Sequence, residues 1–158
     1  MKHAKKLAMV AVLSTLALTG CSKVEEKGDY KEGTYFGYSE AESYGKMFYS
    51  TAVVYVNESG MIKSVFLDNT YSKDDKFTTK KVLGNDYGMK ETSANIGVIE
   101  GGGEWFEQAE VIEDKVLEEQ GLDWVKLNDD KKLDGVSGVT ITADTYVKAI
   151  EEALKQAK

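Results

Sequence analysis

The chain has 158 residues, a formal net charge of −7 at pH 7, and 20 basic residues, all of them lysine. An acidic chain without arginine lacks the cationic surface that nucleic acid requires and the guanidinium groups that clamp phosphates. Its single cysteine, Cys21, excludes an internal disulfide and a zinc site built from cysteines. Its single histidine, His3, lies in the N-terminal leader, which leaves the rest of the chain without histidine for triad catalysis.

The first 20 residues have the pattern of an export signal. Three lysines within the first six residues precede an apolar run from Leu7 to Gly20, and Cys21 follows directly. The run is shorter than the roughly 20 residues that a membrane-spanning helix needs. Leu18-Thr19-Gly20-Cys21 resembles the lipobox of bacterial lipoproteins, which implies removal of residues 1–20 and acylation of Cys21, for example with palmitate. We therefore expect a lipid anchor on the extracytoplasmic face of the cell membrane.

The remainder divides into a tether and one domain. Residues 21–32 are polar and charged without apolar periodicity, which indicates a tether behind the acylated cysteine. Residues 33–158 have the length of a single domain.

The first half of this domain predicts β-strands. β-Branched and aromatic residues fill Thr51–Val56 and Met61–Leu67, and Asn57–Gly60 between them has the composition of a turn. Thr34–Tyr38 adds an expected edge strand. Because helical patterns follow in the second half, the expected fold is α+β, a small antiparallel sheet packed with helices.

A first helix is predicted after three consecutive glycines. Trp105, Ala109, Ile112 and Val116 recur at helical spacing, and Gly121 marks the expected C-terminal end. Trp105 is expected to belong to the core, as large aromatic residues at such positions usually do.

The nine residues Asp134–Thr142 carry the main functional signal and precede the final helix. Apolar residues in Ala143–Leu154 recur at helical intervals, so Thr142 lies at or beside the N-cap and the final helix is expected to start there. Free N–H groups and the helix dipole favour a phosphate at that place. Gly135 and Gly138 allow positive φ angles and close approach of a ligand or a modifying enzyme. The alternative interpretation is an ordinary loop and helix cap.

The same stretch, Asp134-Gly135-Val136-Ser137-Gly138-Val139-Thr140-Ile141-Thr142, resembles the D-G-x-S-G-A-T-x-T signature of the FMN-binding domain family. That family includes the C subunit of the sodium-pumping NADH:quinone reductase and the G subunit of the Rnf complex. The resemblance implies an FMN-binding domain over residues 33–158, with FMN joined to Thr142 through a phosphoester. It also implies cofactor-binding roles for other residues of the motif, namely Asp134, Gly135, Ser137, Gly138 and Thr140. Val139 stands where the family usually has alanine, and its extra methyl groups predict hindrance of the modifying enzyme.

Within the family the chain is similar to flavinylated surface lipoproteins that serve extracellular electron transfer in Gram-positive bacteria. This resemblance implies an electron carrier rather than an enzyme that turns over a substrate. It implies three partners: an FAD-dependent flavin transferase, a membrane quinone or flavoprotein as electron donor, and an extracellular acceptor such as ferric iron. A less specific match covers Lys80–Lys90, where Tyr87 and Met89 border the flavin ring or anchor a loop. Gln108 is a candidate donor to the flavin edge.

Two other functions remain open at this stage. The first is a lipoprotein that binds FMN without a covalent bond, or senses flavin. The second is a precursor whose cleaved leader releases a peptide pheromone from Val12–Gly20, which resembles the arrangement in some Gram-positive lipoproteins.

Overall fold

The computed structural model describes residues 27–43, 45–97 and 99–158. The leader, the lipobox, Cys21 and the first half of the predicted tether, up to residue 26, lie outside the described residues, as does the peptide Val12–Gly20. Within the described part, no helix is both long and apolar enough to cross a membrane.

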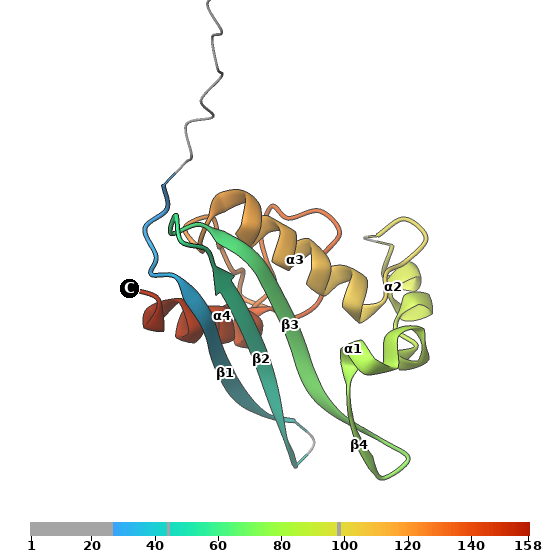
Figure 1. The fold of residues 1–158 in the computed structure, drawn as a ribbon. Helices are drawn as coiled ribbons and strands as arrows, with labels where there is room; N and C mark the ends of the chain where they lie inside the picture. Colours follow the sequence, from blue (N-terminus) through green and yellow to red (C-terminus); the bar gives the residue numbers. More distant parts are fainter. Residues whose placement is uncertain (1–26, 44, 98) are drawn as a thin grey trace, which may run out of the picture.

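Four antiparallel strands form one sheet in the order in which they occur along the chain (Figure 1). They are β1 (Gly33–Ser43), β2 (Lys46–Val56), β3 (Ile62–Lys73) and β4 (Lys76–Thr79). The register places Ala52 of β2 between Gly37 of β1 and Leu67 of β3. The predicted hairpin and the predicted edge strand are confirmed, although each strand is longer than the sequence indicated.

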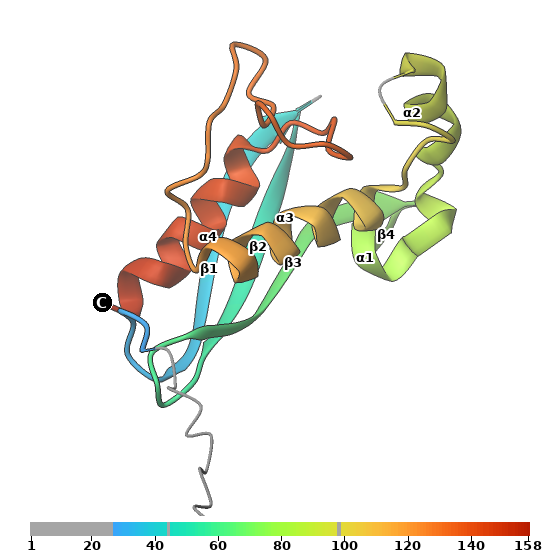
Figure 2. The same ribbon diagram turned by 90° about the horizontal axis from the view of Figure 1, so that it is seen from above.

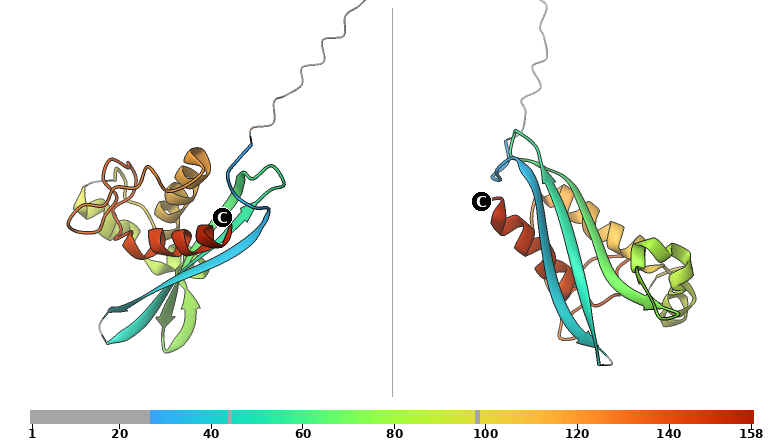
Figure 3. Two further views of the ribbon diagram at one scale, coloured as in Figure 1. Left: turned by 90° about the vertical axis from the view of Figure 1, so that its left-hand side faces the viewer. Right: turned by 60° about the horizontal axis from the view of Figure 1, so that its bottom comes forward.

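Two helices cover one face of this sheet, which confirms the α+β fold (Figure 1, Figure 3). They are α3 (Trp105–Glu119), which packs against β3, and α4 (Asp144–Gln156), which packs against β1 and β2. The covered face is apolar because every second strand residue points to it, as with the fully buried Ala52, Val54 and Val56.

Gly37 explains how closely α4 approaches β1. A Cβ atom at this position would lie 2.1 Å from the carbonyl oxygen of Ala149 and 2.5 Å from the backbone nitrogen of Ala153. Any side chain would therefore force the helix away from the strand. The start of the described chain is also tied to the end of α4, since the N–H of Lys31 donates to the carbonyl of Ala157 at 2.7 Å.

The chain between β4 and α3 folds into three short helical segments that the sequence did not predict. They are α1 (Lys80–Leu83), the 3-10 turn η1 (Gly84–Tyr87) and α2 (Lys90–Ile96) (Figure 2). The carboxylate of Glu104 accepts hydrogen bonds from the N–H groups of Met89 at 2.9 Å and Lys90 at 3.0 Å. A distant carboxylate thus satisfies the N-terminal donors of α2, for which no local cap exists.

The ends of the two long helices differ from the predicted ones. The left-handed residue that ends α3 is Gln120, with φ of 54°, rather than Gly121. The final helix begins at Asp144 and not at Thr142, because Thr142 forms an isolated antiparallel bridge with Lys132. That extended pairing is incompatible with helical backbone angles, so Ala143 is the N-cap.

Candidate functional site

The loop that precedes α4 is closed on itself by backbone pairing. Leu127 and Leu133 form one isolated bridge, and Lys132 and Thr142 form another. The N–H of Ala143 donates to the carbonyl of Lys131 at 2.8 Å. These contacts hold Thr142 directly before the first turn of α4, in agreement with its predicted place beside the N-cap.

A buried glutamine of α3 fixes the same loop from inside. The side-chain oxygen of Gln108 accepts hydrogen bonds from the N–H groups of Thr140 at 2.7 Å and Ile141 at 3.2 Å, and from the Thr140 hydroxyl at 3.1 Å. Its side-chain nitrogen donates to the carbonyl of Gly103 at 3.1 Å. Gln108 is only 1% exposed. The predicted contact of Gln108 with a flavin edge is therefore wrong, because its amide is used to hold the loop.

The motif loop presents a polar outer side and an apolar inner side. Gly135 and Gly138 have φ angles of 75° and 85°, as their positions in the motif predicted. Asp134 and Ser137 are exposed, whereas Val139 is 6% exposed and belongs to the core. The extra methyl groups of Val139 thus face the interior, away from the surface that a modifying enzyme would reach.

A cavity of about 660 Å³ opens beside Thr142. Its lining comes from the β1–β2 end of the sheet, from β3, from the segment after β4, from the loop before the motif and from Thr142 with the start of α4. The residues lining it are Ala41, Ser43, Lys46, Phe48, Asn69, Tyr71, Ser72, Lys80, Tyr87, Lys131, Thr142, Asp144, Thr145 and Tyr146. Its volume falls within the range of about 300 to 1,000 Å³ that is typical of sites for small ligands.

Three lysines line this cavity in a protein that is acidic overall, namely Lys46, Lys80 and Lys131. The only carboxylate among the lining residues belongs to Asp144, and the Lys131 ammonium pairs with it at 2.9 Å. The cavity is therefore locally cationic. A cationic, partly enclosed cavity attracts anions such as phosphates.

The first turn of α4 adds donors for an anion. Ala143, the N-cap, offers no side-chain acceptor to the N–H groups that follow it. Those N–H groups have no partner inside the helix. Beside them, the Thr145 hydroxyl is held at 2.8 Å from the Ser50 hydroxyl, which also accepts from the Asn69 amide at 2.8 Å. The wall next to Thr142 is thus polar and ordered.

Aromatic side chains form another part of the lining. The rings of Tyr71 and Tyr87 meet edge to face, with 5.2 Å between their centroids. The hydroxyl of Tyr146 accepts a hydrogen bond from the indole N–H of Trp105 at 3.1 Å, and burial raises the pKa of this hydroxyl well above its ordinary value. Trp105 is 1% exposed, so its predicted place in the core is confirmed. Flat aromatic surfaces of this kind suit a planar ring system.

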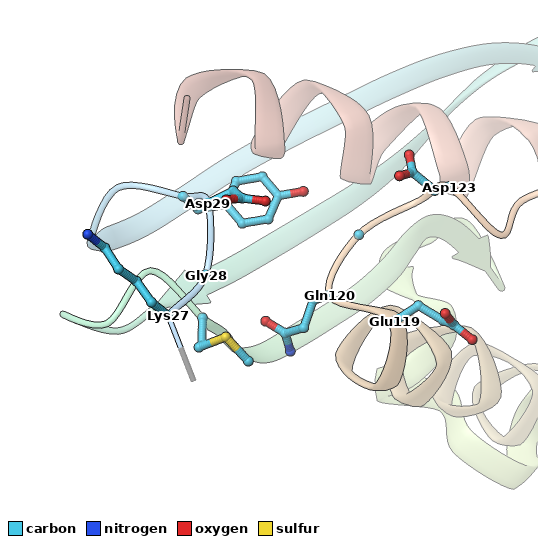
Figure 4. A pocket seen from close by; sticks show the side chains of 9 residues that line it. Lys27, Gly28, Asp29, Glu119, Gln120 and Asp123 are labelled. Atoms are coloured by element: carbon cyan, nitrogen blue, oxygen red, sulfur yellow. The ribbon is translucent and has the colours of Figure 1, made fainter. Parts of the chain in front are cut away.

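A second cavity, of about 520 Å³, lies at the C-terminal end of α3 (Figure 4). Its charged lining is mostly acidic, with Asp29, Glu119 and Asp123 against the single lysine Lys27. No group of three metal-ligating side chains was found among the described residues. An acidic cavity of this kind does not favour a phosphate-bearing ligand.

Of the six predicted cofactor residues, the structure places only Thr142 in the wall of the larger cavity. The other five, Asp134, Gly135, Ser137, Gly138 and Thr140, form the loop that positions it. Tyr87 lines the cavity, as one of the two interpretations expected, whereas Met89 does not. Sequence analysis missed the lysines and Phe48, because these residues converge from β2, α1 and the loop before the motif.

No family model matches the chain, and comparisons with curated proteins and with solved structures found no significant match.

Proposed function

We propose that this domain carries FMN, joined through its phosphate to the Thr142 hydroxyl, and relays electrons outside the cytoplasmic membrane. The observation that supports this most directly is the position of Thr142, on the wall of a cationic, aromatic cavity of about 660 Å³. The resemblance of Asp134–Thr142 to the flavin-attachment signature points to the same hydroxyl.

The residues around the cavity fit the parts of FMN. Lys131 and the N-terminal N–H groups of α4 lie next to Thr142, where they would stabilise the phosphate. Tyr71, Tyr87 and Phe48 provide apolar surface for the flavin ring. When bound, the flavin supplies the redox chemistry, while the protein supplies attachment, orientation and electrostatics.

Attachment requires a flavin donor that is split during the reaction. In the proposed step, the Thr142 oxygen forms a bond to the FMN phosphorus of FAD, and the pyrophosphate bond of FAD breaks. AMP leaves, and the hydroxyl proton passes to a base of the flavin transferase. The exposed side of the motif, with Asp134 and Ser137, is open to such an enzyme.

The setting of the relay follows from the N-terminal sequence. The resemblance of Leu18–Cys21 to a lipobox supports anchoring on the extracytoplasmic face of the membrane, where a covalently held flavin could not diffuse away. A membrane quinone or a membrane flavoprotein would supply electrons, and an extracellular acceptor such as ferric iron would receive them.

The test is co-expression of the exported protein with an FAD-dependent flavin transferase, followed by in-gel flavin fluorescence and intact mass of the denatured chain. We expect a fluorescent band with a mass gain equal to FMN less one water, and its complete loss in Thr142→Ala. Ser72→Ala is the matched control, because it removes another hydroxyl that lines the same cavity. Ser72→Ala should keep the label.

The other outcomes have defined meanings. Flavin that copurifies with the native protein but is lost on denaturation supports the noncovalent binding or sensing function. A protein that stays colourless with an active transferase contradicts flavin binding and leaves Asp134–Thr142 as a loop and cap. If a strain without this protein reduces external ferric iron as fast as its parent, the proposed acceptor is wrong.

A further inference from the structure

Lys80 and Lys81 are neighbours in α1, but their ammonium groups differ in whether they form an ion pair. The Lys81 ammonium pairs with the buried Glu113 carboxylate at 2.6 Å. Lys80 belongs to none of the ion pairs formed within residues 27–43, 45–97 and 99–158. Its side chain instead lines the larger cavity.

The surroundings of the Lys80 ammonium are mainly aromatic. Its nitrogen lies 3.4 Å from the Tyr146 hydroxyl, 5.1 Å from the centre of the Tyr87 ring and 5.4 Å from that of Trp105. Burial lowers the pKa of Lys80 to about 8, and the Asp68 carboxylate on β3 opposes this decrease. The charged and titratable groups that surround Lys80 are Asp68, Tyr71, Tyr87 and Tyr146, with Lys46, Lys131 and Asp144 elsewhere on the wall.

A partly buried ammonium without an ion-pair partner costs folding free energy. The cost is offset when a ligand brings negative charge to the same cavity. The phosphate of the proposed flavin is already provided for, since Lys131 and the first turn of α4 adjoin Thr142. Lys80 lies among the rings of the aromatic wall, where the planar part of the ligand would pack.

We propose, as an extension of the proposed function, that Lys80 is the residue that balances the negative charge which the flavin ring gains on reduction. Lys80 tunes the reduction potential and takes up a proton, whereas the flavin ring itself carries the electrons. Lys80 raises the reduction potential and couples it to pH in the range where its own side chain titrates.

Two-electron reduction of the flavin ring takes up one or two protons, depending on the charge of Lys80. A reductant, dithionite in the test, gives two electrons to the ring, and the ring takes one proton from water. When the Lys80 amine starts charged, no further proton is needed, because its ammonium balances the remaining negative charge. When the amine starts neutral, it takes one more proton from water, and two protons accompany the two electrons.

The experiment is a potentiometric titration of the flavin-loaded full protein with dithionite, between about pH 6 and about pH 10. Each proton taken up lowers the midpoint potential by about 30 mV per pH unit, the potential equivalent of a tenfold change for a two-electron couple. We expect a slope of one proton below the pH at which Lys80 titrates, about 8 in the flavin-free protein, and of two protons above it.

Three variants separate the effect of the charge of Lys80 from the effect of its titration with pH. Lys80→Met should lower the midpoint at neutral pH and remove the steepening near pH 8. Lys80→Arg keeps a permanent charge, so the midpoint should stay near that of the native protein while the steepening disappears. Lys63→Met makes the same charge change on an exposed residue outside the cavity and should change neither quantity.

The outcomes separate this inference from the function on which it rests. Loaded Lys80→Met with a native midpoint and a native break in slope overturns the role of Lys80 and leaves the proposed function intact. A native protein that takes up no flavin overturns both. If Lys80→Met fails to fold by circular dichroism, Lys80→Arg decides, since retention of the break near pH 8 in that variant excludes Lys80 as its source.

Discussion

The two cavities are similar in volume, about 660 Å³ and about 520 Å³, but the charges of their linings are opposite. Lys46, Lys80 and Lys131 line the larger one, whereas three carboxylates and a single lysine line the smaller one. The net charge of −7 would predict neither distribution. The comparison indicates that the lining of the larger cavity is cationic although the chain as a whole is acidic, which suits the anionic ligand proposed to bind there.

The two cavities also differ in how the fold supports them. Near each one, a glutamine reaches to another part of the chain, Gln108 from within α3 and Gln120 from its C-cap. Gln108 is fully buried and holds Thr140, Ile141 and Gly103 near the larger cavity. Gln120 is partly exposed and exchanges two hydrogen bonds with the backbone of Ile62 beside the smaller one, at 2.7 Å and 3.0 Å. The larger cavity is thus built on the more deeply buried polar network.

The largest expected effect is the loss of that network in Gln108→Leu. The variant leaves the buried N–H groups of Thr140 and Ile141 and the carbonyl of Gly103 without their partner, at about 1 to 3 kcal/mol for each group. Allowing for local relaxation, the free energy of unfolding in urea should fall by about 4 kcal/mol. Gln120→Leu is the matched control and should cost about half as much, because the Gln120 side chain is only partly buried. Equal losses of unfolding free energy in the two variants would contradict the conclusion that the larger cavity is built on the more deeply buried network.

The second expected effect is an increase in the free energy of unfolding, not a loss. Because burial lowers the pKa of Lys80 to about 8, the unfolded chain binds more protons than the folded one between about pH 8 and the ordinary lysine pKa. Stability of the flavin-free protein should therefore rise as pH increases from about 8 to about 9.5. Lys80→Met should remove this rise and should raise the free energy of unfolding at pH 7, by up to about 3 kcal/mol. Lys27→Met, in the smaller cavity, should do neither.

Some elements of the fold could be predicted from the sequence alone and others could not. The β2–β3 hairpin and the helices α3 and α4 were predictable, because alternation and helical spacing are local patterns. The segments β4, α1, η1 and α2 were not predicted. The first three have only four residues each, too few for a periodic pattern, and several contacts that hold this part of the chain come from remote residues. Glu104 caps Met89 and Lys90, and the N–H of Lys81 donates to Asp68 at 3.0 Å. Such contacts leave no periodic signal in the chain.

The candidate site was predictable only in part, for the same reason. Thr142 was found because its motif is contiguous and precedes a helix. Lys80 and Lys46 reach the cavity only once β2 and α1 are in place, so no spacing in the sequence connects them to Thr142. The start of the final helix was placed at Thr142, since nothing local reveals the bridge between Thr142 and Lys132.

The third prediction compares the two tryptophans. Trp105 is fully buried and donates its indole N–H to Tyr146 at the larger cavity, whereas Trp124 is partly buried and donates to the carbonyl of Gly121 at 2.9 Å. Trp105→Phe removes a buried hydrogen bond and leaves a void, which should cost about 2 kcal/mol in thermal or urea unfolding. Trp124→Phe should cost less than half of this. The reverse order would contradict the conclusion that the larger cavity is built on the more deeply buried network.

The smallest expected effect tests the difference in charge between the linings of the two cavities. Without a transferase, FMN should bind noncovalently to the larger cavity, and its fluorescence should report the affinity. Lys131→Met should weaken binding about fivefold, a modest factor because Lys131 is largely exposed and pairs with Asp144. Lys27→Met should leave the affinity unchanged, and the difference between the two variants should shrink as salt is added, because exposed charges are screened. Equal weakening by both variants would mean that FMN responds to the net charge of the protein. In that case the cationic cavity would lose its role as the binding site, even if Thr142 remained the site of attachment.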